Sequence, residues 1–374
     1  MKLSIDKQGL YDALNFVTRG TATRSTIGTV RLVASADQKI HMISTDADTT
    51  TTIDIQAEVS EPGVCVVPGR IMTDIVKSLP SNQVVLRFDE GMMDISSLRS
   101  SFTVRVLDVT PIAELPQLTE RTYTIDLDSF SVALKQVLPS ASSDESRPIL
   151  TGVLLDSYDN KLTMVATDSY RLAVKEVYLA DNLTDRYTII LPAKPLNELQ
   201  RFITTNQSYS KSSQEIDAIV SVYVGDAFCQ LVIGNVQLRT RFIEGKYPAY
   251  ERLIPSDYTA KVVVDKDIFV QSLRRVRLLV RDDTTPVKMN IEENKMVLTV
   301  TNQDIGSAVE EIDIEYSDDP IEIAFNPQFL QTGSEVLVGN SIEILISDTT
   351  KPSALQSVDD TSFKYLLMPI KLVT

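Results

Sequence analysis

The sequence is short of the residues that most catalytic and metal sites require. It holds one histidine, His41, so a nucleophile–histidine device has a single possible base, and that residue lies within a predicted strand. Its two cysteines, Cys65 and Cys229, show no metal-type spacing. This usage fits a reducing compartment and argues against a disulfide framework.

Glycine-rich nucleotide loops and long apolar runs are also missing. The chain has 13 glycines, and neither a Gly-x-x-x-x-Gly-Lys-Ser/Thr loop nor a Gly-x-Gly-x-x-Gly fingerprint occurs. No run of 18 apolar residues is present, and residues 1–6 alternate like a strand rather than a secretion signal. The residues therefore predict a cytoplasmic protein that is not an enzyme, holds no cofactor or metal and has no membrane partner.

The chain also lacks an excess of positive charge. Its net charge is −15 over 374 residues, which favours solubility and opposes attraction of nucleic acid to the surface as a whole. A hydrophobic content of 43% is enough for two or three cores of ordinary size. Contact with a polyanion would therefore need a local cluster of cations.

What the chain does contain is a threefold repetition. An alternating apolar strand that ends in Asp and precedes an apolar helix face occurs at residues 2–6, 123–126 and 262–265. In each case a leucine lies eight residues beyond the Asp. Aspartate at this point is suited to cap a helix. We therefore predict helix N-caps at Asp6, Asp126 and Asp265.

Two later landmarks follow each cap in the same order. A Thr-Asp or Thr-Asn pair comes 40, 42 and 37 residues after the cap, at Asp46, Asp168 and Asn302. These polar residues end strands, where we expect them to form turns. A proline comes 62, 66 and 62 residues after the cap, at Pro68, Pro192 and Pro327. The chain is therefore predicted to be three tandem copies of one domain, at 1–119, 120–254 and 255–374.

Each copy is predicted to contribute two helices and a set of alternating strands, which makes the fold class α+β. Helices are expected near 7–18, 69–78, 128–138, 194–203, 266–280 and 327–333. Strands are expected at 83–88, 161–166, 218–224 and 342–346, among others. Polar segments at 140–146 and 204–213 are predicted to be loops.

Positive charge gathers on the predicted helices. The helical stretches with their adjoining loops sum to +7, which leaves −22 on the rest of the chain. The most basic stretch is 266–281. A solvated face would explain the cations of any one helix. For the whole set, the segregation indicates one surface that faces a polyanion.

Four segments resemble the beta subunit of bacterial DNA polymerase III, the sliding-clamp family. They are Arg-Pro-Ile-Leu-Thr-Gly at 147–152, Ala-Thr-Asp-Ser-Tyr-Arg-Leu-Ala at 166–173, Glu-Gly-Lys-Tyr-Pro-Ala-Tyr-Glu-Arg-Leu-Ile-Pro at 244–255 and Tyr-Leu-Leu-Met-Pro-Ile-Lys-Leu at 365–372. The resemblance runs from Met1 to Thr374. It implies three DNA-clamp domains per chain and a ring formed by a head-to-tail homodimer, with helices lining a central hole and sheets outside.

The resemblance also implies a function and partners. Such a ring is a processivity factor that encircles duplex DNA without sequence preference. Its protein partners would be the replicative DNA polymerase, the clamp loader and other proteins that carry clamp-binding peptides.

A peptide-binding pocket between the second and third copies is implied as well. Carried over residue by residue, it comprises Leu150, Thr167, Ser169, Tyr170, Arg171, Leu172, Pro248, Arg252, Leu253, Leu366, Leu367, Met368, Pro369 and Ile370. Ser169-Tyr170 stands where many relatives carry Gly-His. The competing interpretation makes 366–372 the last buried strand and Leu172 a core residue.

The family's dimer contact joins edge strands of the first and third domains through a small apolar cluster. The matching positions here are Phe102, Leu278 and Leu279, for each of which a buried core position is the alternative. For DNA, Arg24 matches a position that the family uses for backbone contact. Helix position adds Arg147, Lys194, Arg201, Arg274, Arg275 and Arg277.

Two other classes of protein stay open from the residues alone. A surface adhesin of triplicated β-rich domains would need a secretion signal. A hydrolase that uses clustered carboxylates would need a pocket of strongly perturbed acids.

Overall fold

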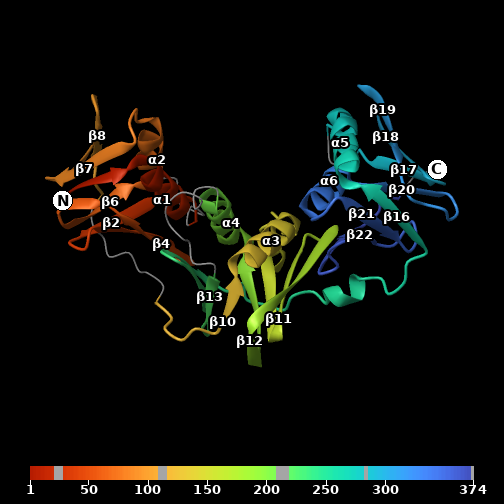
Figure 1. Ribbon diagram of the computed structural model, residues 1–374, viewed down its shortest axis with the longest axis horizontal. Coiled ribbons are helices and arrows are strands. Elements are labelled where there is room, and N and C mark those ends of the chain that lie inside the picture. The colour runs from red at the N-terminus through yellow and green to blue at the C-terminus, as the bar shows by residue number, and fades with distance from the viewer. Residues whose placement is uncertain (21–27, 108–115, 208–218, 282–284, 372–374) are drawn as a thin grey trace. The chain divides into compact units, whose positions relative to one another are not determined.

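The computed structural model describes residues 1–20, 28–107, 116–207, 219–281 and 285–371. The chain separates into two compact units. Unit 1 comprises Met1–Ser131, Tyr158–Asn160 and Leu179–Ile243, and unit 2 comprises Val132–Ser157, Lys161–Tyr178 and Glu244–Thr374. Figure 1 shows that each unit combines helices with twisted antiparallel sheets, as the predicted α+β class requires.

The helices confirm the sequence prediction in number and place. Within the described residues they are α1 (Lys7–Gly20), α2 (Gly69–Ser78), α3 (Leu127–Val137), α4 (Ala193–Gln207), α5 (Lys266–Val276) and α6 (Pro327–Val336). Short 3₁₀ turns are η1 (Leu138–Ser140), η2 (Pro148–Thr151), η3 (Tyr250–Leu253) and η4 (Arg277–Leu279). The loop predicted at 204–213 was wrong for 204–207, where α4 continues, and the remainder lies outside the described residues.

All three predicted N-caps are confirmed. Asp6 accepts a hydrogen bond from the backbone N–H of Gly9 at 2.8 Å, and Asp126 accepts one from Ser129 at 2.8 Å. Asp265 accepts the equivalent bond from Ile268 at 2.9 Å. Each bond satisfies a backbone donor that the first turn of a helix leaves unpaired, a contribution of about 1 kcal/mol.

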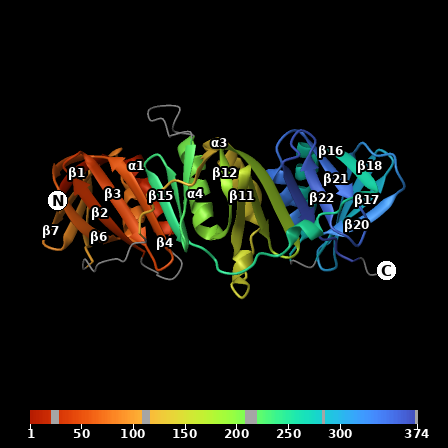
Figure 2. The ribbon, with the colours of Figure 1, turned by 90° about the horizontal axis from the view of Figure 1, so that it is seen from below.

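Unit 1 contains two antiparallel sheets, whose strands are seen in Figure 2. The five-stranded sheet has the order β5 (Glu58–Glu61), β1 (Lys2–Asp6), β7 (Gln83–Asp89), β8 (Met92–Ser97), β9 (Ser100–Arg105). The eight-stranded sheet has the order β10 (Tyr123–Asp126), β13 (Ile219–Val224), β14 (Phe228–Ile233), β15 (Val236–Arg241), β4 (Thr49–Gln56), β3 (Lys39–Thr45), β2 (Thr29–Ser35), β6 (Gly63–Pro68).

Unit 2 is built around two further sheets. The six-stranded sheet has the order β11 (Gly152–Thr167), β12 (Arg171–Pro192), β23 (Phe363–Leu367), β22 (Ser353–Ser357), β21 (Ser341–Ile346), β16 (Ala260–Asp265). The four-stranded sheet has the order β19 (Gly306–Asp313), β18 (Lys295–Asn302), β17 (Val287–Glu292), β20 (Ile321–Phe325). The long strands β11 and β12 contribute residues to both units.

Neighbouring copies of the repeat share sheets. β15 of the second copy pairs with β4 of the first, for example Leu238 with Thr51. β12 of the second copy pairs with β23 of the third, for example Leu172 with Leu366. The second copy is therefore hydrogen-bonded on both sides, which explains why three copies of a domain form two compact units.

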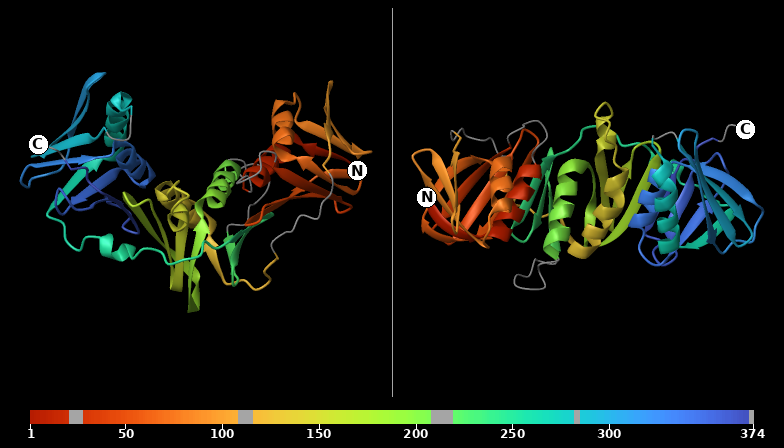
Figure 3. Two further views of the ribbon diagram at one scale, coloured as in Figure 1. Left: turned by 180° about the vertical axis from the view of Figure 1, so that it is seen from behind. Right: turned by 90° about the horizontal axis from the view of Figure 1, so that it is seen from above.

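The repeated leucines anchor one helix of each copy. Leu14 on α1, Leu134 on α3 and Leu273 on α5 are each 0% exposed. Full burial of such a side chain contributes roughly 1.5–3 kcal/mol. Figure 3 shows the helices of each unit lying on one face of its sheets.

The Thr-Asp and Thr-Asn landmarks are structural turns, as predicted. Asp46 accepts the backbone N–H of Thr49 at 2.7 Å, and Asn302 accepts that of Asp304 at 3.0 Å. Asp168 accepts that of Arg171 at 3.0 Å. Asp168 differs from Asp46 and Asn302 because it also accepts a hydrogen bond from the Arg171 side chain.

Candidate functional site

Reactive side chains are few in the described part of the chain. His41 pairs with Asp54 across β3 and β4, and its side chain is 39% exposed, as predicted for a strand position. Burial raises the pKa of the Cys65 and Cys229 thiols to about 12, so both stay protonated and unreactive at neutral pH.

The described residues also offer no metal cluster and no membrane-spanning helix. No group of three or more His, Cys, Asp or Glu side chains within the described ranges could hold a metal ion. No helix among the described residues is long and apolar enough to cross a membrane.

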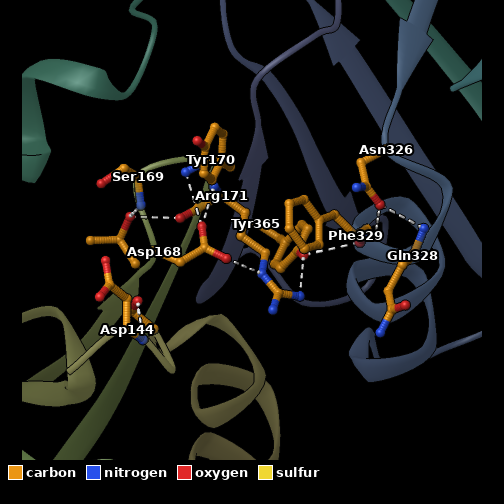
Figure 4. Close-up of polar contacts among 11 residues, drawn as sticks. Asp144, Asp168, Ser169, Tyr170, Arg171, Asn326, Gln328, Phe329 and Tyr365 are labelled. Carbon is orange, nitrogen blue, oxygen red and sulfur yellow. Dashed lines mark hydrogen bonds and ion pairs between the residues drawn. The ribbon is translucent and has the colours of Figure 1, made fainter. Parts of the chain in front are cut away.

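The turn between β11 and β12 forms the centre of the predicted peptide site (Figure 4). Asp168 Oδ1 accepts the backbone N–H groups of Tyr170 at 2.9 Å and Arg171 at 3.0 Å, while its Oδ2 accepts Arg171 Nε at 2.9 Å. The Thr167 hydroxyl donates to the Arg171 carbonyl at 2.6 Å and accepts the Ser169 N–H at 3.2 Å. The turn is thus fixed by its own side chains.

Ser169 adopts a left-handed backbone conformation, with φ at 82°. A residue with a Cβ is strained in this conformation, so contacts with neighbouring residues must stabilise it. Arg147 Nη1 donates to Ser169 Oγ at 3.0 Å, and Arg147 Nε donates to Asp144 Oδ2 at 2.9 Å. Hydrogen bonds from Ser146 and Arg147 lower the pKa of Asp144. Arg147, predicted to contact DNA, therefore lies beside the turn of the predicted peptide site.

Arg171 links the turn to the third copy of the repeat. Its guanidinium carbon lies 4.3 Å from the centre of the Phe329 ring, a cation–π contact. Its Nη1 donates to the Tyr365 hydroxyl at 3.4 Å, which donates to the Phe329 carbonyl at 3.0 Å. The Arg171 and Asp168 side chains are only 13% and 12% exposed. Burial raises the pKa of Tyr365 to about 12, so this hydroxyl remains a donor.

Phe329 and its supports were missed by the sequence reasoning. The Asn326 side chain caps α6 by accepting the N–H groups of Gln328 at 2.9 Å and Phe329 at 3.2 Å. The Tyr170 ring stacks on Phe329 with centroids 6.5 Å apart and planes at 30°. The available signal was the landmark Pro327, which marks the start of α6, but it does not show which strand the helix meets.

The C-terminal residues are brought to the same turn. Met368 N donates to the Tyr170 carbonyl at 2.9 Å, and Ile370 N donates to the Ala324 carbonyl at 2.7 Å. Met368 is 43% exposed. Pro369 and Ile370 are half-buried.

Several predicted pocket residues are core in the free chain. Leu172 is 3% exposed, and Leu366 and Leu367 are each 2% exposed, as the competing interpretation expected. Leu150, on η2, is also buried, at 8% exposed. Thr167 is also buried, at 5% exposed, so the surface of the site is supplied by its remaining members.

The remaining predicted pocket residues lie on the segment that contains η3. Pro248, Arg252 and Leu253 are exposed, Leu253 at 49%. The adjacent Tyr247 is buried, and its hydroxyl donates to the Val165 carbonyl of β11 at 3.4 Å. This bond holds the segment against the strand that leads into the turn.

The cations predicted to contact DNA are dispersed over the described helices. Lys194 and Arg201 lie on α4, and Arg201 Nη1 is 2.9 Å from Glu198 Oε1. A cleft of about 280 Å³ between α1 and α4 is lined by Arg19, Arg201 and the Phe16 and Phe202 rings, among others. Arg24 lies outside the described residues.

The arginines of α5 and η4 are held by side chains of their own unit. Arg274 is 2.8 Å from Glu335 and Arg275 is 2.6 Å from Glu310, while Arg277 donates to Gln328 at 3.3 Å. The hydrogen bonds from Arg275 lower the pKa of Glu310. Arg274 and Arg275 of the most basic predicted stretch are thus paired with carboxylates, whereas the partners of Arg277 are neutral amides.

The predicted dimer residues lie at sheet edges or on the surface. Phe102 is 39% exposed on β9, the edge strand of the five-stranded sheet. Leu278 is 76% exposed on η4, with Leu279 half-buried beside it. β19, which packs against η4, is the edge of the four-stranded sheet and exposes Val309 at 63%. A core position is therefore excluded for Leu278.

Comparison with known proteins adds family assignments along the chain. Three family models match in succession: the N-terminal domain of the DNA polymerase III beta subunit at 1–118, its central domain at 124–249 and its C-terminal domain at 251–371. The beta sliding clamp of Streptomyces coelicolor is 29% identical over 381 residues, with 100% of both chains covered. That of Synechocystis is 28% identical over 399 residues, again with 100% of both covered.

Solved structures are similar over the whole chain. The DNA polymerase sliding clamp of Bacillus subtilis has a TM-score of 0.85 at 25% identity, and the beta subunit of Thermotoga maritima has 0.86 at 25%. A sliding clamp of Bartonella birtlesii bound to griselimycin has a TM-score of 0.87 at 26% identity. Each comparison covers 100% of both chains.

Proposed function

Because this chain belongs to the DNA polymerase III beta subunit family, we propose that the turn between β11 and β12 holds the peptides of its client proteins. The chain is a DNA sliding clamp, a non-catalytic processivity factor that encircles duplex DNA without sequence preference. It tethers the replicative polymerase and other DNA-processing proteins. The observation that carries this function is the succession of three beta-subunit domains along one chain.

The three clamp domains are proposed to span 1–119, 120–254 and 255–374. Two chains supply six such domains, and a head-to-tail contact between them closes a ring when the rotation is right. Retention on DNA is then topological. The ring works in the cytoplasm, where duplex DNA is replicated.

The client site is proposed to comprise the predicted pocket residues together with Asn326 and Phe329. Its base is the largely buried Asp168–Arg171 ion pair, and the hydrogen bonds of Asp168 fix the conformation of the turn. Its apolar surface includes Met368 and Leu253, which remain exposed in the free chain. A rigid polar base with exposed apolar side chains suits a short extended peptide with apolar anchors.

Met368 supports this assignment for a second reason. Its unbranched thioether can repack around anchors of different shape, which a clamp with several clients needs.

The clamps of Bartonella birtlesii and Pseudomonas aeruginosa bind griselimycin, so relatives do accept a ligand.

The dimer contact is proposed to join β9 of one chain to β19 of its partner. Among the described residues both are edge strands, with no strand paired on one side, and pairing them would remove a site of aggregation. The apolar cluster would be formed by Phe102 on β9 together with Leu278 and Leu279, which lie beside β19. Glu311 on β19 and Arg105 on β9 carry opposite charges, which favours pairing β9 with β19 over pairing two copies of the same strand.

The DNA contacts are proposed to be few and made to phosphates. Arg24, Arg147, Lys194, Arg201, Arg274, Arg275 and Arg277 are the candidate residues. The ion pairs of Arg201, Arg274 and Arg275 reduce the charge available to the duplex. Weak and scattered attraction lets the ring slide, whereas many simultaneous phosphate contacts would hold it in place.

Retention on circular DNA tests the proposed function. The protein is loaded onto closed circular duplex by a clamp loader, freed of unbound protein by gel filtration, and followed after one cut by a restriction enzyme. A ring held topologically stays on the closed circle and leaves once ends are available. Retention that is the same before and after the cut would refute the encircling mode.

A further inference from the structure

Phe329 has a fixed backbone at the start of α6, and its ring contacts the Arg171 side chain. Its backbone N–H donates to Asn326 and its carbonyl accepts from Tyr365. The Arg171 guanidinium lies 4.3 Å from its ring centre. The ring is therefore a preorganised platform for a planar group.

Tyr170 also has a fixed backbone, but its ring is exposed to solvent. Its backbone is fixed at both ends, because its N–H donates to Asp168 at 2.9 Å and its carbonyl accepts from Met368 at 2.9 Å. Its side chain is 62% exposed and contacts the platform loosely, with ring centroids 6.5 Å apart. Rotation about the side-chain bonds can therefore move the ring without disturbing the turn.

The position of Tyr170 follows from its neighbour. Ser169 takes the left-handed conformation, with φ at 82°, and Arg147 holds its hydroxyl at 3.0 Å. Tyr170 follows Ser169 in this turn (Figure 4), and its ring centroid lies 6.5 Å from that of Phe329 on α6. A tyrosine at this position places an aromatic ring over Phe329 while no client is bound.

We propose that Tyr170 is a displaceable ring that occupies the Phe329 platform and selects among client peptides. The proposal rests on the client site proposed above. A peptide with an aromatic anchor gains the platform only by displacing Tyr170. A peptide with an aliphatic anchor gains little from the aromatic face, so it binds beside Met368 with Tyr170 in place. Tyr170 is thus a specificity-determining residue that disfavours aromatic anchors.

The size of the effect follows from the strength of the stack. Stacking of two aromatic rings favours the stacked over the unstacked state by roughly 3- to 10-fold. The apparent affinity is the intrinsic affinity multiplied by the fraction of molecules whose platform is free. Removing the resident ring should therefore strengthen binding of an aromatic anchor by roughly 3- to 10-fold.

Two fluorescein-labelled peptides provide the binding test. They share an alternating apolar pattern and differ only in the last anchor, Phe in one and Leu in the other. Fluorescence polarisation with the full-length protein compares wild type with Tyr170→Ala. We expect the Phe peptide to bind roughly 3- to 10-fold tighter to the variant and the Leu peptide to change by less than about twofold. Tyr170→Phe, which keeps the ring, should match wild type, as should Tyr178→Ala, which removes a 71% exposed tyrosine from β12.

The opposite results are equally clear. Weaker binding of both peptides to Tyr170→Ala would make the ring a wall of the site rather than an occupant. Equal effects on both peptides, or none on either, would also overturn the selective role of Tyr170. If neither peptide binds wild type or any variant, the proposed client site itself fails, and the selectivity fails with it.

Fluorine NMR of protein labelled with fluorotyrosine gives a readout that needs no client. The Tyr170 signal is the one lost in Tyr170→Phe among the 13 tyrosines. Because Phe329 shields a ring stacked on it, Phe329→Leu should shift this signal, and so should saturating Phe peptide. A signal that neither change moves would show that the stack is absent in solution and would overturn the proposal.

Discussion

Replacing Leu278 with alanine removes an apolar side chain that a single chain leaves in water. Leu278 is 76% exposed on η4, beside the edge strand β19. Burying a whole leucine contributes roughly 1.5–3 kcal/mol, so its loss should cost one dimer contact roughly 1–2 kcal/mol. A head-to-tail dimer contains the contact twice, which brings the total to roughly 2–4 kcal/mol. At tenfold for each ~1.4 kcal/mol, the dissociation constant should rise roughly 30- to 1,000-fold.

Sedimentation velocity over a wide range of protein concentration measures this change. The monomer has a mass of 41.6 kDa, and the dimer has twice that mass. Leu278→Asp together with Leu279→Asp should give monomers throughout, because each substitution adds the cost of burying a charge. The free energy of unfolding, measured in urea, should change by less than ~0.5 kcal/mol for Leu278→Ala, because the side chain is largely exposed in the single chain.

Ile219→Ala is the matched control for the dimer experiment. Ile219 is 50% exposed on β13, which lies between two other strands and is not a sheet edge. It should leave the dissociation constant unchanged. An unchanged dimer in both Leu278 variants, or equal weakening by Ile219→Ala, would remove Leu278 from the interface and refute the reasoning.

Three further predictions concern the other sites. Asp168→Asn leaves the largely buried Arg171 guanidinium without its counter-ion. We therefore expect the free energy of unfolding in urea to fall by roughly 3–5 kcal/mol and peptide binding to be lost. An unaffected unfolding curve would argue against a coupled pair. Arg24→Ala should weaken binding to short duplexes of different sequence by the same factor and reduce the slope of log K against log salt by about 0.9, whereas a sequence-dependent loss would contradict phosphate contact. Hydrogen bonds from Arg275 hold the pKa of Glu310 below its usual 4.5, so the stabilisation from this pair is complete above pH 4.5 and disappears as the pH falls through the lower folded value. The thermal midpoint of wild type should therefore fall more steeply between pH 5 and pH 3, as roughly bracketed by these values, than that of Glu310→Gln, and parallel curves would count against the assignment.

The sequence alone predicted what depends on neighbours along the chain. The N-caps at Asp6, Asp126 and Asp265 bond the residue three positions on, so a local pattern was sufficient to find them. The leucines eight residues later were found by helical period, since one face of each helix must be buried. The threefold repeat, the helices and the strands rest on the same local signals.

The composition of the client site depended on long-range contacts. Arg171 and Phe329 are far apart in sequence, and they meet because β12 pairs with β23 while α6 packs against β23. No local pattern specifies which helix terminus lies against which turn. The family resemblance assigned the turn and the C-terminal strand to the proposed client site, whereas the proximity of Phe329 to Arg171 appeared only in the folded chain.

The state of each charge and apolar side chain was likewise decided by tertiary structure. Arg274 and Arg275 read as free cations in sequence, yet Glu335 and Glu310 reach them from α6 and β19. Leu172 was predicted to line the peptide site and Leu278 the dimer contact, yet Leu172 is 3% exposed and Leu278 is 76% exposed. Burial and pairing are properties of the whole packing, because the area a side chain loses to solvent is set by segments far from it in the chain.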